Sequence, residues 1–211
     1  MEKIIFYKKK DILSFFSDKI EDNIKKIINK GFKTEFDKNL DFLFNADLSC
    51  FAYDTSAKKI IGYCYGNIDN NIFHISGFVT DPSFFQKYIS VDLLTFAIKL
   101  ANRNFISYHT QNPFAYLLVD RLGAIQYPSP NTEQKPYSID KILSKKLKNS
   151  TDHFLLKKSV VLNKYDDCLY KKIPHSKNSI INNWFNEQLL VKKGKTRHAF
   201  FIIADVNFML K

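Results

Sequence analysis

Three segments rich in β-forming residues follow one another in the first half of the chain, at 49–54, 59–67 and 71–80. Short polar turns, with the sequences DTSAK and DN, separate them. Closely spaced runs of this length with turns this short are typical of an antiparallel meander. We therefore expect three consecutive antiparallel strands.

The segment after the meander alternates helical and extended patterns. Residues 84–102 carry a broad apolar face, 105–109 form a short extended run, and 113–122 form a second helical segment that stops at Gly123. Glycine directly after an apolar-periodic segment commonly ends a helix. A meander followed by helix, strand and helix predicts a mixed α/β fold, with a sheet flanked by helices.

Apolar residues recur at steps of three and four residues near the N-terminus, which is the pattern of an amphipathic helix. We expect this helix over 11–30, with Gly31 as its C-cap, and a second short helix near 37–44. The apolar positions of the first helix are Leu13, Phe16, Ile20, Ile24 and Ile27.

Three prolines, at 128, 130 and 136, indicate an exposed loop or linker. The sequence is therefore divided into a domain at 1–127, a linker at 128–137 and an α+β extension at 138–211. A meander plus one further strand makes a small sheet, and strands of the extension are available to complete it. The elements expected in the extension are a helix at 138–147, a strand at 153–162, a helix at 176–189 and a closing strand at 197–210.

The charge of the chain is uneven. The net charge is +11, and residues 140–211 hold 15 basic and 6 acidic residues, against 17 and 15 in residues 1–139. Such a basic block is most often a solvated face, and it also suits nucleic acid, anionic lipid or an acidic protein. Tyr170, Trp184 and Phe185 interleave with the basic residues, a composition found on nucleic-acid-binding surfaces, although no RNA-binding motif accompanies them.

Composition also bears on location and on metal binding. No apolar run reaches the roughly 18 residues of a membrane span, and the N-terminus lacks the apolar core of a signal peptide. The excess of Phe, Tyr, Ile, Lys and Asn indicates an AT-rich genome, so we expect a bacterial, cytoplasmic protein. The three cysteines, Cys50, Cys64 and Cys168, lack a CxxC spacing, which predicts buried, reduced thiols and no metal site.

Two segments carry a resemblance to a known family. Residues 77–94 read GFVTDPSFFQKYISVDLL, and residues 112–124 read NPFAYLLVDRLGA. The first resembles the acyl-CoA motif of the GNAT acyltransferases, a strand followed by a phosphate-binding loop and a helix that begins with paired leucines. The second is similar to the family's N-P-x-A-x-x-L-Y-x-x-L-G-F pattern. The resemblance covers about residues 40–127, and it implies a GNAT-like fold and an acyltransferase that uses acetyl-CoA or another acyl thioester as donor.

In the family, backbone N–H groups at the start of the helix bind the CoA pyrophosphate, and glycines let the backbone approach it closely. The strand before the loop has free backbone groups that pair with the pantetheine arm. The residues that the resemblance assigns to donor binding are Phe78, Val79, Thr80, Phe85, Gln86, Lys87, Tyr88, Ile89, Ser90 and Asn112.

The chain also departs from the family pattern. Aligning the paired leucines puts Phe85 on the Gln/Arg position, Tyr88 on the first glycine and Ser90 on the second small residue. Aligning Gln86 instead puts Ile89 and Val91 on the two small positions. Either alignment places a bulky side chain where the loop needs none, which predicts weak CoA binding.

A second departure concerns the proton donor. Val119 occupies the position of the family's tyrosine, which commonly protonates the departing CoA thiolate. Tyr116, one helical turn earlier, is the candidate replacement, with ordinary packing as the alternative. The resemblance also points to the third strand as the place of the catalytic base, where His74 and Ser76 share a side under period-2 alternation. A structural or exposed histidine is the alternative there.

Three functions follow. The first is an N-acyltransferase with a remodelled donor loop, acting on an unknown amine. The second is a catalytically silent GNAT-like module that binds a ligand or partner. The third is an RNA- or tRNA-directed acyltransferase whose basic C-terminal third docks the substrate.

Overall fold

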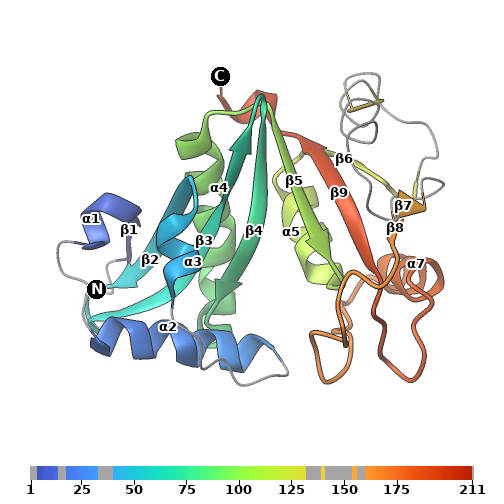
Figure 1. Cartoon of the computed structure of the whole chain (residues 1–211), viewed down its shortest axis with the longest axis horizontal. Helices are drawn as coiled ribbons and strands as arrows, with labels where there is room; N and C mark the ends of the chain where they lie inside the picture. Colours follow the sequence, from blue (N-terminus) through green and yellow to red (C-terminus); the bar gives the residue numbers. More distant parts are fainter. Residues whose placement is uncertain are drawn as a thin grey trace. The chain divides into compact units, whose positions relative to one another are not determined.

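The computed structural model describes residues 4–13, 18–32, 40–131, 139–140, 154–155 and 160–210 (Figure 1). The chain forms two compact units. Unit 1 consists of residues 1–104 together with 207–211, and unit 2 consists of residues 105–206. Each unit is described by itself below.

Unit 1 contains an antiparallel sheet with the strand order β1-β2-β3-β4. The expected meander is confirmed, and it gains an N-terminal strand that the sequence patterns did not predict. The strands are β1 (Ile4–Lys8), β2 (Leu48–Asp54), β3 (Lys59–Asp69) and β4 (Ile72–Thr80).

Helices cover the sheet of unit 1. They are α1 (Lys9–Leu13), α2 (Asp18–Gly31), α3 (Asp41–Asn45) and α4 (Ile89–Ala101), with the 3-10 helices η1 (Pro82–Lys87) and η2 (Asn207–Leu210).

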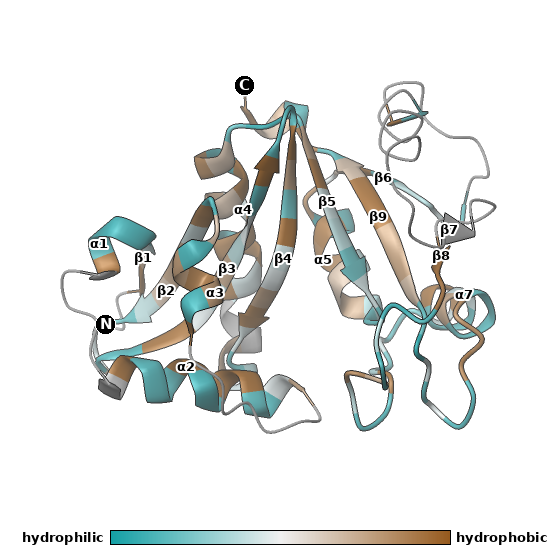
Figure 2. Ribbon diagram, in the orientation of Figure 1, coloured by the Kyte–Doolittle hydropathy of each residue, from teal (hydrophilic) through white to brown (hydrophobic). Residues whose placement is uncertain are grey.

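The two faces of the unit 1 sheet pack against different helices. Phe51, Tyr63 and Val79 lie in register across β2, β3 and β4, and they share an apolar core with residues of α2 and α3. Gly62 faces the other side, where its Cβ position lies 3.2 Å from Leu93 of α4. Figure 2 shows brown, hydrophobic segments along these strands and α4. Alternation along each strand therefore supplies apolar residues to two helical layers.

Unit 2 is built around β9 (Ala199–Asp205), a strand of seven residues of which six are buried. It pairs antiparallel with β5 (Phe105–Thr110), with β8 (Val160–Val161) and with β6 (Ile125–Tyr127), while β7 (Phe154–Leu155) pairs with β8. The closing strand expected at 197–210 is thus confirmed over 199–205, while its last part, Asn207–Leu210, is the 3-10 helix η2. A continuous apolar run indicates a strand buried on both faces, and β9 has this property.

Two helices, α5 (Pro113–Arg121) and α7 (Ser179–Gln188), accompany these strands. They meet through an aromatic cluster in which Trp184 stacks on Phe200 at 4.3 Å between ring centroids, and Tyr116 meets Trp184 edge-on at 5.3 Å. Trp184 and Phe185 thus belong to the packing of unit 2, which corrects the interpretation of these residues as part of a nucleic-acid surface.

Several elements differ from those expected. The helix predicted at 84–102 is two elements, η1 and α4, separated by Tyr88, whose φ of 56° no continuous helix accommodates. The strand predicted at 153–162 includes two short antiparallel strands, β7 and β8. Gly31 is the last residue of α2, not a left-handed C-cap, because Phe32 N–H still bonds Ile28 O at 3.0 Å.

Some expectations stay open. The predicted helix at 138–147 lies outside the described residues except at 139–140, as do most of the linker and part of the predicted helix near 37–44. Among the described residues, no helix is long and apolar enough to cross a membrane.

Candidate functional site

Strand β4 carries the candidate base at an irregular point of the sheet. Its register with β3 shifts between Tyr65 and Gly66, and Ser76 is the residue left without a partner. Two glycines allow this bulge, because a Cβ on Gly66 would lie 2.0 Å from the His74 carbonyl oxygen and one on Gly77 would lie 2.1 Å from the Tyr65 ring. The bulge interrupts the period-2 alternation between half-buried His74 and exposed Ser76, so the expectation that they share a side no longer follows from the strand pattern. Bulges often occur where a strand re-aims its side chains near a functional site.

The loop after β4 begins with a buried carboxylate. Asp81 caps η1 by accepting hydrogen bonds from the backbone N–H (3.0 Å) and the hydroxyl (2.8 Å) of Ser83, and it forms a salt bridge with Lys30 of α2 at 3.1 Å. Burial by itself would raise the pKa of Asp81, but the Ser83 hydrogen bonds and the Lys30 ammonium outweigh it and lower that pKa. The loop is thereby tied to α2 through an ionised side chain.

Tyr88 forms the turn between η1 and α4. Its φ of 56° and ψ of 14° lie in the left-handed region, and Val91 N–H (2.9 Å) and Asp92 N–H (3.1 Å) both donate to its carbonyl oxygen. A residue other than glycine in this region costs on the order of 1 kcal/mol or more, so the surrounding structure must fix it. The backbone at position 88 has the conformation that glycine adopts most easily, while the side chain is 62% exposed.

This geometry distinguishes the two alignments to the GNAT motif. The first alignment puts Tyr88 on the family's first glycine, and Tyr88 is the residue with positive φ. The second puts Ile89 on a small position, but Ile89 is buried in the core at 2% exposure. The conformation of the loop therefore favours the first alignment.

Ser90 holds the first turn of α4 against the end of β4. Its hydroxyl lies 2.8 Å from that of Thr80. The first backbone N–H groups of a helix have no partners within the helix and carry the positive end of its dipole. Val91 N–H is already bonded to the Tyr88 carbonyl oxygen, so the candidate anion site of the loop comprises residues 88–90. The side chains of Phe85, Gln86 and Lys87 lie outside the described part of the structure.

In unit 2, Asn112 begins α5. Its side-chain oxygen accepts a hydrogen bond from Phe114 N–H at 2.9 Å, and Pro113 occupies the first helical position. Asn112 therefore caps α5 through this hydrogen bond. Its amide also contacts the Tyr170 hydroxyl at 3.5 Å, and burial raises the pKa of Tyr170 to about 12. Gly123 ends the helix region with φ of 80°, as predicted.

Gln111, next to Asn112, joins three segments of unit 2 and was missed by the sequence patterns. Only 1% of it is exposed, and its amide nitrogen donates to the carbonyl oxygens of Thr196 (2.9 Å) and His198 (3.1 Å). Its oxygen accepts from Leu169 N–H at 3.1 Å. A buried amide satisfied on both sides fixes the start of α5. A single glutamine carries no signal of such a task in one sequence.

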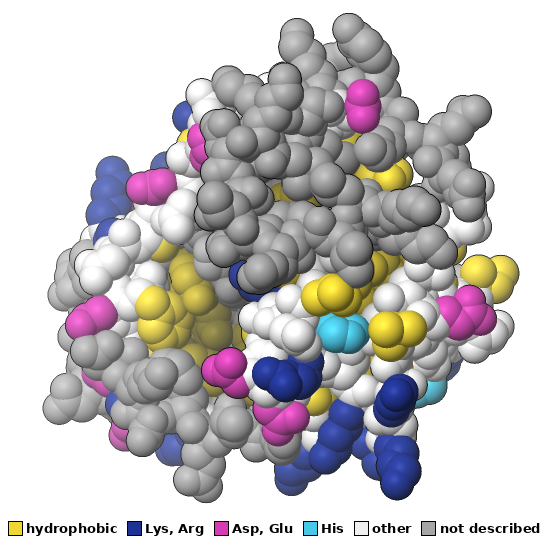
Figure 3. Space-filling view, turned by 45° about the vertical axis from the view of Figure 1, so that its right-hand side comes forward, with side chains coloured by type: hydrophobic (Ala, Val, Ile, Leu, Met, Phe, Trp, Pro, Cys, Tyr) yellow, Lys and Arg dark blue, Asp and Glu magenta, His cyan; other side chains and the backbone are white. Residues whose placement is uncertain are grey.

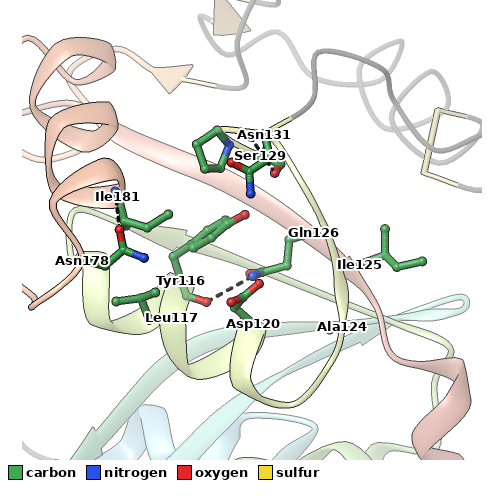
Figure 4. Close-up of a pocket in the computed structure, with 11 residues that line it drawn as sticks. Tyr116, Leu117, Asp120, Ala124, Ile125, Gln126, Ser129, Asn131, Asn178 and Ile181 are labelled. Carbon is green, nitrogen blue, oxygen red and sulfur yellow. Dashed lines mark hydrogen bonds between the residues drawn. The ribbon is translucent and has the colours of Figure 1, made fainter.

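Tyr116 lines a pocket of about 260 Å³ in unit 2 (Figure 4). Gln126 lies beside it, donating to the Tyr116 carbonyl oxygen at 3.1 Å and accepting from the Tyr108 hydroxyl at 2.7 Å. Burial raises the pKa of Tyr116, against the opposing effect of a hydrogen bond with Ser129. Its phenol therefore stays protonated at neutral pH. The side chain is only 4% exposed and packs against Trp184, so both candidate tasks, proton donor and packing residue, remain open.

The candidate residues fall into two groups. Unit 1 brings Thr80, Tyr88 and Ser90 together around the start of α4, with His74 and Ser76 on the strand that leads there. Unit 2 carries Asn112 and Tyr116 on α5. Phe78 is half-buried and Val79 is buried on β4. Within the described ranges, no group of three or more His, Cys, Asp or Glu side chains is arranged to hold a metal ion.

Comparison with known proteins adds the fold. The sequence matches no protein-family model, and a search of curated proteins finds no match. Among solved structures, an IAA acetyltransferase from Bacillus cereus aligns over 96% of this chain and 99% of its own, with 9% identity and a TM-score of 0.51. The chain has the GNAT fold.

Other GNAT structures match a smaller part. A GNAT-family acetyltransferase from Staphylococcus aureus aligns over 64% of this chain and 94% of its own, with 15% identity and a TM-score of 0.45. Diaminobutyrate acetyltransferase from Paenibacillus lautus, in complex with L-2,4-diaminobutyric acid and coenzyme A, aligns over 60% and 80%, with 13% identity and a TM-score of 0.46. At 9% identity the likeness to the Bacillus cereus structure shows the fold alone, and the activity has to be argued from the residues.

Proposed function

We propose that the protein is an N-acyltransferase that transfers an acyl group from acetyl-CoA or another acyl thioester to an amine, through a remodelled donor loop. The observation that carries this proposal is the left-handed turn at Tyr88, directly before the first turn of α4. A packing element alone has no need of a turn that glycine adopts more easily. An anion site at the start of α4 does need it, because the N–H groups must face the phosphates.

The chain supplies candidate groups for each step. The amine nitrogen of the acceptor attacks the thioester carbonyl carbon, and His74 is the candidate base that takes the amine proton. Ser76 offers a hydroxyl to the acceptor at the same strand. The carbon–sulfur bond breaks as the amide forms, and Tyr116, protonated at neutral pH, is the candidate donor to the departing thiolate.

The Tyr88 side chain sets the expected affinity. A pyrophosphate seated on α4 receives charge-assisted hydrogen bonds, each worth about 1.5–3 kcal/mol. Losing two of them weakens binding by roughly two to four orders of magnitude. We therefore propose that acyl-CoA binds weakly, and that a donor recognised mainly through its pantetheine arm and thioester is used more efficiently.

A thiol-release assay tests the activity. Acetyl-CoA at millimolar concentration is incubated with a panel of primary amines, from spermidine to short peptides, and free CoA thiol is followed over time. We expect amine-dependent release that His74→Ala abolishes. Tyr116→Phe keeps the ring packed on Trp184 and removes the hydroxyl, so a lower kcat with unchanged stability supports the proton-donor role.

The second candidate function is a silent binding module, and two observations favour it. Tyr116 is buried, and the family's tyrosine position is occupied by Val119, which is buried and cannot donate a proton. The two functions separate clearly. Binding of acetyl-CoA without thiol release for any amine, in the wild-type protein and the His74→Ala variant alike, contradicts the acyltransferase and supports the module.

A further inference from the structure

Two loops of unit 2 carry a high density of cationic side chains. They are residues 164–173, between β8 and α7, and residues 190–197, between α7 and β9. Seven cationic side chains in these loops are exposed, and the acidic residues there are Asp166 and Asp167. We refer to these seven as the basic face: Lys164, Lys171, Lys172, Lys192, Lys193, Lys195 and Arg197.

Backbone hydrogen bonds hold the two loops together. Ile173 N–H donates to Gly194 O at 2.7 Å, and Tyr165 N–H donates to Arg197 O at 3.2 Å. Lys192 and Lys195 exchange hydrogen bonds of 2.9 and 3.0 Å across a tight turn. These contacts bring cations that are about 20 residues apart in sequence onto one preformed surface.

Gly194 makes this approach possible. Its φ of 76° lies in the left-handed region, and its Cβ position is 3.4 Å from the side-chain carbons of Lys172. The aliphatic stem of Lys172 therefore lies along the tip of the other loop while the residue remains exposed. The Lys172 stem thus lies against the loop that carries Lys193 and Lys195.

The charge of the basic face is not balanced within the described residues. The salt bridges between described residues are Lys25 with Glu21 and Lys30 with Asp81, and both belong to unit 1. Figure 3 shows the dark-blue Lys and Arg side chains gathered toward the lower right of the surface. Concentrated like charge on one rigid surface attracts a polyanion and raises its rate of association.

The aromatic residues decide which polyanion fits. Single-stranded nucleic acid is bound through exposed aromatic rings on which bases stack. Here Phe185 is fully buried, Trp184 is half-buried and stacked on Phe200, and the loop residues Tyr165 and Tyr170 are half-buried. The two loops of the basic face therefore carry no fully exposed aromatic ring among their described residues. Such a surface matches the regularly spaced phosphates of a double helix, whose bases are already stacked on each other.

We propose that the basic face binds the phosphate backbone of a double-helical nucleic acid, without reading its sequence. This proposal is independent of the acyltransferase activity. Insertion into a membrane would need a larger apolar surface than these loops expose. Ile173 is only 2% exposed, and Leu190, at 61% exposure, is a single large apolar side chain at the surface of the described loops.

Fluorescence anisotropy with a labelled 20-base-pair duplex tests the proposal. If about five phosphates are contacted, affinity falls by roughly two to three orders of magnitude between 50 and 200 mM salt. Two duplexes of the same kind and length but of unrelated base sequence should bind with similar affinity, because phosphate contacts carry no sequence information.

A matched pair of variants separates the basic face from the net charge of the protein. The triple variant Lys171→Gln, Lys193→Gln, Lys195→Gln removes three cations of the face, and we expect its salt slope to fall by about three units. The control is Lys8→Gln, Lys26→Gln, Lys99→Gln, which removes three exposed lysines of unit 1 and should leave the slope unchanged.

Four outcomes overturn the proposal. The first two are no duplex binding at 50 mM salt and an equal loss in both triple variants. The other two are binding to vesicles of anionic lipid that depends on the face while duplex binding does not, and tighter binding to a single strand of the same length than to the duplex.

Discussion

The side-chain hydroxyls of Thr80, the last residue of β4, and Ser90, in the first turn of α4, lie 2.8 Å apart. This contact spans the whole donor loop and fixes where α4 begins relative to the strand. A partly buried hydrogen bond of this kind contributes about 1 kcal/mol. In a double-mutant cycle with Thr80→Val and Ser90→Ala, we expect a coupling free energy near that value from urea unfolding. Strictly additive effects of the two substitutions would show that the hydroxyls do not interact.

The Asp81 carboxylate makes stability depend on acid pH. Its pKa in the folded protein is lowered, so its contribution is fully present above the pKa of the unfolded chain and is lost as pH falls through the folded value. The reference pKa of Asp is about 3.9. We therefore expect the free energy of unfolding to fall more steeply between pH 5 and pH 3 in the wild type than in Asp81→Asn. Urea unfolding at each pH measures this difference. Parallel curves for the two proteins would contradict the ionised role.

Two glycines of unit 1 should respond oppositely to alanine. Gly66→Ala places a Cβ 2.0 Å from a backbone carbonyl oxygen, so we expect a loss of about 2 kcal/mol or more in the free energy of unfolding. Gly31→Ala meets only a Val79 methyl group at 3.6 Å, and within helix α2 it should stabilise by about 0.5–1 kcal/mol. Thermal and urea unfolding of both variants give the comparison, and a similar effect at both positions would show that the bulge tolerates a side chain.

Strand β9 should be essential to unit 2. It lies between β5 and β8 and also pairs with β6, and its side chains from Ala199 to Ala204 are all buried. Removing residues 197–211 takes away the partner that β5, β6 and β8 share, so we expect an insoluble or unfolded product. A soluble truncated protein with a cooperative thermal transition would show that the strand is dispensable.

The sequence predicted the elements whose pattern is local. The meander, β5, α5 with its Asn112 cap and the apolar run of β9 follow from periodicity and capping residues close together in the chain. The split of 84–102 escaped prediction because no residue there looks like a helix stop. Tyr88 adopts a glycine-like conformation that its own propensity opposes, and the loop imposes it.

The candidate site was predictable only in part. The GNAT resemblance located the segment from β4 to α4, and it pointed to Tyr88 as a departure. The bulge at Ser76, the buried Gln111 and the joined basic loops depend on contacts between residues distant in sequence, which no local pattern contains. The interleaved aromatic residues were misleading, because composition does not show that Phe185 is fully buried and Trp184 half-buried.

Calorimetric titration with acetyl-CoA tests the central claim, which is that Tyr88 occupies a glycine position of a remodelled donor loop. The unmodified protein should bind with a Kd weaker than about 100 μM. Tyr88→Gly removes both the ring and the strain, and we expect it to tighten binding at least tenfold, while Tyr88→Ala, which keeps a Cβ at positive φ, should gain less. Tight binding by the unmodified protein, unchanged in Tyr88→Gly, would contradict the account.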